Sequence, residues 1–289
     1  MRRSNQTKEW RLGRHFNSRL VMKPFNRCSS GKRICSVLIV ATFALTLLNA
    51  PGWAQITKKG DPPPLKICLV SGSAEYMSHE SLGEFQKFLE SYYNVVCSRA
   101  FGDDKGSEIP GLETLDNADV MVLFTRRITL APQQLESVKR FCDSGKGVVG
   151  IRTASHAFQN WLEIDKELWG GSYQGHYNAD EVATVSIVAK NQAHPVLTGV
   201  KPFTTPGKLY KNPNLAADVN LLLEAKNKTN TEPVAWTRAR KGGRTVYTSL
   251  GVPDDFKDKN FRQMLANAIF WTGHREAAQN IKALKPVTP

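Results

Sequence analysis

The sequence predicts an α/β protein with a doubly wound, mostly parallel sheet that is extended by antiparallel strands. Two observations support this fold class. In the first half of the body, short apolar runs alternate with segments of helical periodicity in units of roughly 30 residues, as in strand–helix–strand units with right-handed crossovers. In the second half, short β-like runs are separated by Pro, Gly and Asn, as between antiparallel strands.

Four strands and two helices are expected in the first half. Residues 65–71 form a short apolar run that ends in Ser-Gly-Ser, which is typical of a buried strand followed by a turn. The second helix begins at Pro132, a residue suited to a first helical turn, and stops before Gly145. The expected strands are 65–71, 93–97, 119–124 and 146–151, and the expected helices are 80–91 and 132–144.

The second half is expected to add short strands and a closing helix. Its last segment, 260–272, carries Phe261, Leu265 and Ile269 at helical spacing. Because parallel sheets bind ligands outside the carboxyl ends of their strands, we expect loops 72–79, 125–130 and 152–160 to meet on one rim. The expected strands of this half are 182–189, 220–223, 234–237 and 245–249.

The net charge of +13 is concentrated at the N-terminus. Residues 1–54 hold ten basic residues against one acid, so the remainder carries only +4. A body this close to neutral offers no broad surface for a phosphate backbone, so no nucleic-acid partner is expected. With 41% hydrophobic residues the chain can form a core, which excludes disorder.

The basic segment precedes an uncharged apolar run, 34–48, and then Gly52 and Ala54 at positions −3 and −1 of a cleavage site. This order is that of a secretory signal, 1–54, with Met22 as an alternative start. An uncleaved N-terminal anchor is the alternative, although 15 apolar residues are short for a membrane span. We therefore expect an exported protein, periplasmic or extracellular, with no membrane contact after signal cleavage.

The mature chain is expected to form one domain. Residues 55–64 are polar and Pro-rich and predict a tether, 65–275 carry the α/β domain, and 276–289 form a polar tail. Cys68, Cys97 and Cys142 remain after signal removal, each within an apolar pattern, so they are expected to be buried free thiols rather than disulfide partners.

The most informative stretch follows the fourth strand. In hydrolases and amidotransferases of this layout, a sharp strand-to-helix turn presents a Ser or Cys nucleophile, and here Arg152 occupies that position. A guanidinium stays protonated and cannot attack an acyl carbon, which excludes covalent acyl transfer from this turn. Arg152 could instead hold a carboxylate or hydroxyl oxygens, or it could form an ion pair that ties the turn to a neighbouring loop.

Two motifs, GIRTASHAF at 150–158 and LWGGSYQGH at 168–176, resemble the ThuA-like (trehalose-utilisation) family of the class I glutamine amidotransferase-like superfamily. Further similar motifs, among them HPV at 194–196, KLYK at 208–211 and GRTVYTSLG at 243–251, extend the resemblance over about 66–273. The resemblance implies a flavodoxin-like core and a role in carbohydrate metabolism, without glutamine amidotransferase activity. Many relatives have Gly-Ile-His at the turn, so a role of that His cannot pass to Arg152.

Three side chains are candidates for catalysis. His79 lies in the first rim loop near Glu75 and Glu80 and suits acid–base work, or else it orders the start of a helix. His156 follows Arg152 by four residues and would share its face on a helical turn, with loop packing as the alternative. Together with Arg152 they form the expected catalytic set.

Six further residues are candidates for substrate binding. Arg126 is preferred to Arg127 because it is nearer the strand end, and Asp254 belongs to an acidic pair that could orient hydroxyls or cap the last helix. Aromatic side chains beside His176 could face a sugar ring, although a surface loop is the alternative there. The expected binding residues are Tyr76, Arg126, Tyr173, His176, Tyr210 and Asp254.

No cofactor or metal is expected. No GxGxxG or P-loop is present, and no pair of histidines has HxH or HExxH spacing. A metal site assembled in space from His79, His156 and His176 stays open. The expected partner is a small-molecule carbohydrate, and the nearly neutral body neither requires nor forbids a homo-oligomer. Two functions remain: an enzyme, such as a hydrolase or lyase, acting on a sugar or modified disaccharide, or a non-catalytic sugar-binding module.

Overall fold

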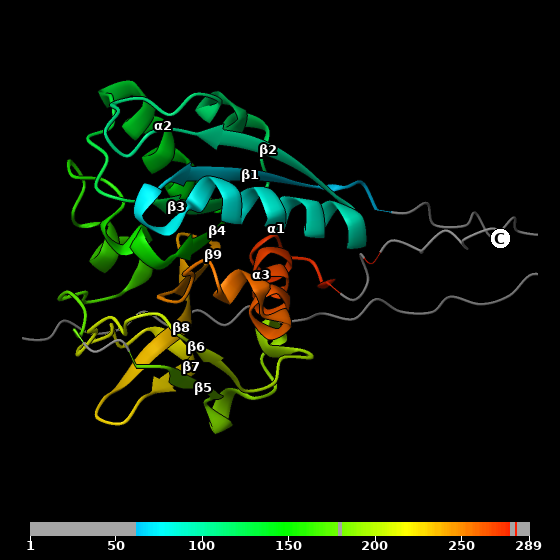
Figure 1. Cartoon of the computed structure of the whole chain (residues 1–289). Helices are drawn as coiled ribbons and strands as arrows, with labels where there is room; N and C mark the ends of the chain where they lie inside the picture. The colour runs from blue at the N-terminus through cyan, green and yellow to red at the C-terminus, as the bar shows by residue number, and fades with distance from the viewer. Residues whose placement is uncertain (1–61, 179–180, 278–280, 282–289) are drawn as a thin grey trace, which may run out of the picture. The chain divides into compact units, whose positions relative to one another are not determined.

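A nine-stranded mixed sheet organises the protein, as the computed structural model in Figure 1 shows. The structure describes residues 62–178, 181–277 and 281. These lie in one unit, Lys58–Pro289. The expected signal, most of the expected tether and most of the expected tail lie outside the described residues.

The sheet has a parallel half and an antiparallel half. Its strand order is β2-β1-β3-β4-β9-β8-β7-β5-β6. The pairs from β2 to β9 are parallel and those from β9 to β6 are antiparallel, so β9 joins the two halves. The predicted fold class is confirmed. The strands are β1 (Leu65–Gly72), β2 (Val95–Phe101), β3 (Val120–Thr125), β4 (Gly147–Ile151), β5 (Ala183–Ile187), β6 (Phe203–Thr205), β7 (Val219–Lys226), β8 (Thr231–Arg240) and β9 (Gly243–Thr248).

Helices cover both faces of the parallel half (Figure 1). On one face α1 (Ser78–Tyr92) and α3 (Lys259–Thr272) pack their apolar side chains against alternate residues of β1, β3 and β4. On the other face α2 (Pro132–Asp143) covers the remaining residues of these strands. Because both faces are covered, β3 and β4 are buried at every position, which explains their continuous apolar sequence.

Gly83, inside α1, gives a simple stability prediction. An added Cβ there would meet only Arg99 Nη2, at 3.8 Å. Alanine lowers the conformational entropy of the unfolded chain and favours the helix, so Gly83→Ala is expected to raise the free energy of unfolding by up to about 1 kcal/mol. Urea denaturation monitored by circular dichroism measures this change. A fall in stability would show that the interior of α1 is more crowded than described.

The expected strands differ from the structure in their bounds. β7 and β8 are longer than the expected 220–223 and 234–237. The second strand was expected at 93–97 but β2 runs from Val95 to Phe101, because only Val95 and Ala100 of this edge strand are fully buried and it lacks a continuous apolar signal. β6 has only three residues and was not expected. Cys68, Cys97 and Cys142 are free, as predicted, but only Cys68 and Cys142 are buried and Cys97 is half-buried. No helix within the described residues is long and apolar enough to span a membrane.

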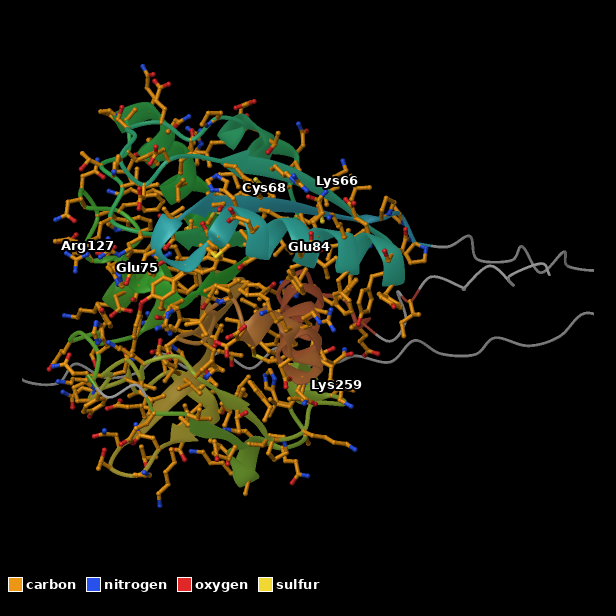
Figure 2. The ribbon with its side chains drawn as sticks, viewed as in Figure 1. Lys66, Cys68, Glu75, Glu84, Arg127 and Lys259 are labelled. Atoms are coloured by element: carbon orange, nitrogen blue, oxygen red, sulfur yellow. The ribbon has the colours of Figure 1, made fainter. Side chains whose placement is uncertain are left out.

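The loops that follow β1, β3 and β4 meet at one edge, as predicted. The amide of Arg126 donates to the carbonyl of Gly72 at 2.9 Å, and the amide of Arg127 donates to that of His156, also at 2.9 Å. Figure 2 shows Glu75 and Arg127 at this edge, whereas Lys66, near the start of β1, lies toward the opposite end of the strand. These contacts place the three loops where a ligand site is expected.

Candidate functional site

The turn after β4 has the geometry of an elbow. Arg152 adopts a φ of 47°, a left-handed conformation that is costly for a residue with a Cβ. Its carbonyl accepts a hydrogen bond of 2.7 Å from the hydroxyl of Tyr247. Just before the turn, Gly150 lies so close to Trp169 that an added Cβ would be 2.6 Å from the indole ring. The backbone therefore holds residue 152 in the strained position that a nucleophile occupies in related folds.

The side chain of Arg152 is held between aromatic rings. Its Cζ lies 4.4 Å from the ring centroid of Tyr76 and 4.6 Å from that of Tyr210. Nη1 donates to the carbonyl of Ser249 at 2.8 Å, and only 2% of the residue is exposed. Cation–π contacts of this kind are stronger when the cation is desolvated. The structure thus brings together Arg152 and Tyr76, from two of the predicted rim loops, and Tyr210, from a segment outside them.

His156 lies in the short helix Arg152–His156 and is buried. Its ring stacks on that of Tyr173, with centroids 4.5 Å apart. Burial, reinforced by three nearby arginines, lowers the pKa of His156 to about 3, so the ring is neutral near pH 7.

Its ring nitrogen Nδ1 lies 3.0 Å from the hydroxyl of Ser155. That hydroxyl also lies 3.5 Å from the carbonyl of Arg152 and interacts with the hydroxyl of Tyr247. Because its contact with Nδ1 is shorter than that with the carbonyl, we assign the Ser155 hydroxyl as donor to Nδ1, which leaves the proton of the neutral ring on Nε2.

Asp165 is a site residue that the sequence did not predict. It opens the short π-helix Asp165–Trp169, and its Oδ2 accepts a hydrogen bond of 2.7 Å from the amide of Tyr173. Its Oδ1 is buried without a hydrogen-bond partner among the described residues. Burial raises the pKa of Asp165 to about 6, although the bond from Tyr173 opposes the shift. The only sequence signal was indirect: Gly171 must lack a side chain, because a Cβ there would collide with Asp165 Oδ1.

His156, Tyr173 and Asp165 line one cavity of about 770 Å³, which we call the His156 cavity. The volume is within the range of pockets that bind small molecules. Its wall combines an aromatic ring, a carboxyl group, a cation and several amides and hydroxyls. The other lining residues are Arg127, Ser155, Gln159, Leu162, Lys166, Gly171, Ser172, Gln174, Gly175, Asn214, Leu215 and Ala216.

A second cavity of about 310 Å³ lies at Arg152, and we call it the Arg152 cavity. Tyr210 connects the two sites, because its ring packs on Arg152 and lies 4.6 Å from the ring of Tyr173, centroid to centroid. The residues that line the Arg152 cavity are Glu75, Tyr76, Arg152, His176, Pro206, Gly207, Lys208 and Val252.

The structure reverses the preference between the two arginines that follow β3. Arg126 was preferred for the site, but it pairs with Glu75 at 2.7 Å. Arg127, at a φ of 52°, lines the His156 cavity instead. The left-handed backbone at Arg127 redirects the chain after the strand end, so nearness to the strand did not decide which side chain lines the cavity.

The acidic pair 254–255 is corrected in the same way. Asp254 is exposed and forms an ion pair of 2.6 Å with Lys257, so it does not line either cavity. Asp255 is 1% exposed, and its Oδ2 accepts from the amides of Gly251 and Val252. The carboxylate that the fold draws inward is therefore the second of the pair, because it caps the turn after β9.

The three histidines are not gathered in one place. His79, at the start of α1, packs edge-on against Phe101 and lines neither cavity. His156 lines one cavity and His176, which is exposed, lines the other. Among the described residues no group of three His, Cys, Asp or Glu side chains is arranged to hold a metal ion. The set His79, His156 and His176 therefore provides no assembled metal site.

The unusual pKa values of His156 and Asp165 predict opposite effects on stability. For His156 the pKa falls from 6.5 to about 3 on folding. Its contribution to the free energy of unfolding is therefore lost as the pH drops through this range. For Asp165 the pKa rises from 3.8 to about 6 on folding. Its contribution to the free energy of unfolding is therefore present at low pH and is lost as the pH rises toward 6. The two largely offset each other between about pH 4 and pH 6.

Replacing either Asp165 or His156 should reveal the effect of the other residue on the pH dependence of stability. On acidification from pH 6 to pH 4, Asp165→Asn is expected to lose roughly 1 kcal/mol of unfolding free energy per pH unit relative to wild type, and His156→Gln to gain a similar amount. Urea denaturation at several pH values measures both. Parallel curves for the three proteins would contradict the shifted pKa values.

Comparison with known proteins agrees with this architecture. A family model described as ThuA, trehalose utilisation, matches residues 66–272. A ThuA-like protein of Bacteroides uniformis superposes with a TM-score of 0.58 at 19% identity, covering 75% of this chain and 95% of that one. A ThuA-like protein of Parabacteroides merdae superposes with a TM-score of 0.58 at 16% identity, covering 78% and 94%. No curated protein matches the chain. At these identities the solved structures support the fold alone.

Proposed function

Since the chain belongs to the ThuA, trehalose utilisation, family, we propose that it is an enzyme that acts on a carbohydrate by proton transfer in the His156 cavity. Arg152 at the elbow excludes a covalent acyl intermediate formed there, because a guanidinium is no nucleophile. The chemistry must therefore come from the ionisable groups that line the cavity.

One observation carries this proposal: the cavity contains a carboxyl group that binds its proton more tightly than the histidine does. Burial raises the pKa of Asp165 to about 6 and lowers the pKa of His156 to about 3. Groups whose environments push their pKa values apart in this way are typical of acid–base sites. Near pH 7 the pair consists of a carboxylate with a strengthened basicity and a neutral imidazole that donates from Nε2.

These states suit the removal of a proton from a carbon next to a carbonyl group. The carboxylate of Asp165 would accept the proton, and Nε2–H of His156 would donate a hydrogen bond to the carbonyl oxygen on which negative charge develops. The product enolate can then be reprotonated at a neighbouring atom, which is isomerisation, or it can expel a β-substituent, which is elimination. Both belong to the lyase and isomerase classes.

The other residues that line the His156 cavity suit a sugar. The ring of Tyr173 offers a flat face, and the amides of Gln159, Gln174 and Asn214 offer hydrogen bonds to hydroxyl groups. Arg127 adds a cation that can bind a hydroxyl or carbonyl oxygen. About 770 Å³ is large enough for a monosaccharide or a disaccharide.

Deuterium exchange tests this proposal without knowledge of the product. The protein is incubated in D₂O with a panel of aldoses, ketoses and reducing disaccharides, and proton NMR follows the loss of signal from the carbon next to the carbonyl group. We expect exchange with at least one sugar in wild type and a strong reduction in His156→Gln. Arg140→Gln, on the exposed surface of α2, is the control. No exchange with any sugar that binds would refute the proposed chemistry.

The lost nucleophile favours a second candidate, a sugar-binding accessory module. Arg152 has replaced the attacking residue, and Tyr76 and Tyr210 now enclose its side chain. In this case calorimetry would detect sugar binding, while no sugar would exchange deuterium or be converted at any pH. Sugar binding by wild type without any exchange or conversion, and unchanged in Asp165→Asn and His156→Gln, would support the module and contradict the enzyme.

Export is also part of the proposal and rests on the N-terminal sequence. The order of basic, apolar and small residues in 1–54 supports a cleaved secretory signal. Expression of the full chain in a Gram-negative host, followed by N-terminal sequencing of the protein from the periplasm, tests it. Cleavage after Ala54 is expected, and retention of residues 34–48 on a membrane-bound protein would favour the uncleaved anchor.

A further inference from the structure

We propose that the Arg152 cavity binds an oxyanion of the ligand, so that the carbohydrate recognised by this protein is an acidic sugar carrying a carboxylate or a phosphate. The inference rests on the proposed function for the sugar itself. Its basis is the unpaired charge of Arg152 at the wall of a cavity, together with the surroundings of that charge.

Arg152 is a buried cation without a carboxylate partner. Only 2% of the residue is exposed, and among the described residues no carboxylate lies within ion-pair distance of it. Its Nε is buried and has no hydrogen-bond partner there. A buried charge is costly unless it is paired and fully hydrogen-bonded, and two aromatic faces and three carbonyl or hydroxyl oxygens compensate it only in part. An anionic ligand would supply the missing partner.

The end of the guanidinium that reaches the cavity makes only long contacts. Nη2 lies 3.4 Å from the hydroxyl of Tyr76 and 3.4 Å from the carbonyl of Lys208, and both residues line the cavity. Charge-assisted bonds to a carboxylate or phosphate are shorter, at about 2.7–2.9 Å. Gly207, which also lines the cavity, lies at the other end of the guanidinium, where an added Cβ would be 3.3 Å from Nη1.

The acidic groups around the cavity are already engaged by other partners. Glu75 lines it, but its carboxylate pairs with Arg126 at 2.7 Å. Asp255 attracts Arg152 electrostatically, but two backbone amides bind its Oδ2, at 2.7 and 3.0 Å, and burial raises its pKa, which weakens its capacity to neutralise the guanidinium. Arg152 therefore favours an anion over a neutral hydroxyl group.

The two cavities are neighbours through Tyr210, which is buried and contacts a residue of each. Its ring centroid lies 4.6 Å from Cζ of Arg152 and 4.6 Å from the ring centroid of Tyr173. The loop from Ser172 to His176 lines both cavities. A sugar ring on Tyr173 would thus place an acidic substituent toward Arg152, which points to uronates, aldonates or sugar phosphates as the substrate class.

Isothermal titration calorimetry with matched ligands tests the inference. The probes are glucuronate, its neutral methyl ester, glucose and glucose 6-phosphate, each with wild type, Arg152→Lys, Arg152→Gln and the control Arg140→Gln. In wild type and Arg140→Gln, glucuronate or glucose 6-phosphate should bind about tenfold or more tightly than the methyl ester and glucose. Which of the two anions binds identifies carboxylate or phosphate. Arg152→Gln should abolish the preference, and Arg152→Lys should keep part of it.

The outcomes separate this inference from the proposed function. Equal binding of the acid and its ester by wild type, or a preference that survives in folded Arg152→Gln, would overturn the anion site. If neutral sugars still bind and exchange deuterium, the proposed function stands without the anion site. Circular dichroism establishes whether each variant is folded, and the wild-type comparison of acid and ester is decisive even if Arg152→Gln fails to fold.

Discussion

Asp165→Asn is expected to reduce deuterium exchange into the sugar by about 10²- to 10⁴-fold while sugar binding is retained. Asparagine preserves the shape of the side chain but cannot accept a proton, so only the transfer step is lost. In wild type the rate should rise about tenfold per pH unit below about pH 6 and level off above it, because the carboxylate form of Asp165 is the active one. Proton NMR at several pH values measures both effects.

Asp218→Asn is the matched control for this experiment. Asp218 is more than half exposed and forms an ion pair with Arg238 at 2.8 Å, and it lines neither cavity. Its variant should therefore exchange deuterium at the wild-type rate. If Asp165→Asn matched this control, or if the wild-type profile showed no change near pH 6, Asp165 would not be the base.

Trp169→Ala is expected to lower the free energy of unfolding by about 3–5 kcal/mol. The indole is fully buried and fills the space left by Gly150, and its Nε1 donates to the carbonyl of Ala154 at 2.9 Å. Truncation would open a cavity beneath the elbow and leave that carbonyl buried without its partner. Urea denaturation monitored by far-UV circular dichroism measures the loss.

Trp169→Phe separates the contribution of apolar packing from that of the hydrogen bond to Ala154. Phenylalanine keeps most of the apolar volume and removes the hydrogen bond, so its loss of stability should be clearly smaller than that of alanine. The amide hydrogens of 152–156 should exchange faster with solvent in the alanine variant, because the indole supports this turn from below. A near-neutral Trp169→Ala would show that the elbow does not depend on this packing.

Much of the fold could be predicted from the sequence because the parallel core has strong local signals. β3 and β4 are buried on both faces and therefore appear as continuous apolar runs, and α2 begins at a proline and ends before a glycine. The edges were less predictable. Only two positions of β2 are fully buried, so it shows no clear period. β6 is too short to show any period, so its pairing with β5 is a property of the assembled sheet.

The site could be predicted only in part, because position in a loop does not fix the direction of a side chain. Topology placed Arg152, Tyr76 and His156 correctly at the rim. It could not choose between Arg126 and Arg127, since a single left-handed residue decided which one lines the cavity. The roles of all these residues stay predictions until they are tested by mutation.

Asp165 escaped prediction for a related reason. The residues near Asp165 in the sequence do not indicate a raised pKa, because the shift results from burial in the tertiary structure. The two glycines after Trp169 serve the local structure: Gly170 adopts a left-handed φ of 68° that ends the π-helix, and Gly171 makes room for the Asp165 carboxylate.

The position of β9 has a consequence for biosynthesis. This strand lies at the centre of the sheet, between β4 and β8, yet it is made after all the other strands. In a nascent chain that has emerged from the ribosome only as far as residue 240, β4 is an open edge, because its neighbour β9 is not yet synthesised. Such an unpaired apolar edge invites association with other chains. A ribosome that stalls before β9 therefore leaves a product prone to aggregation, which chaperones must hold until the last fifty residues emerge.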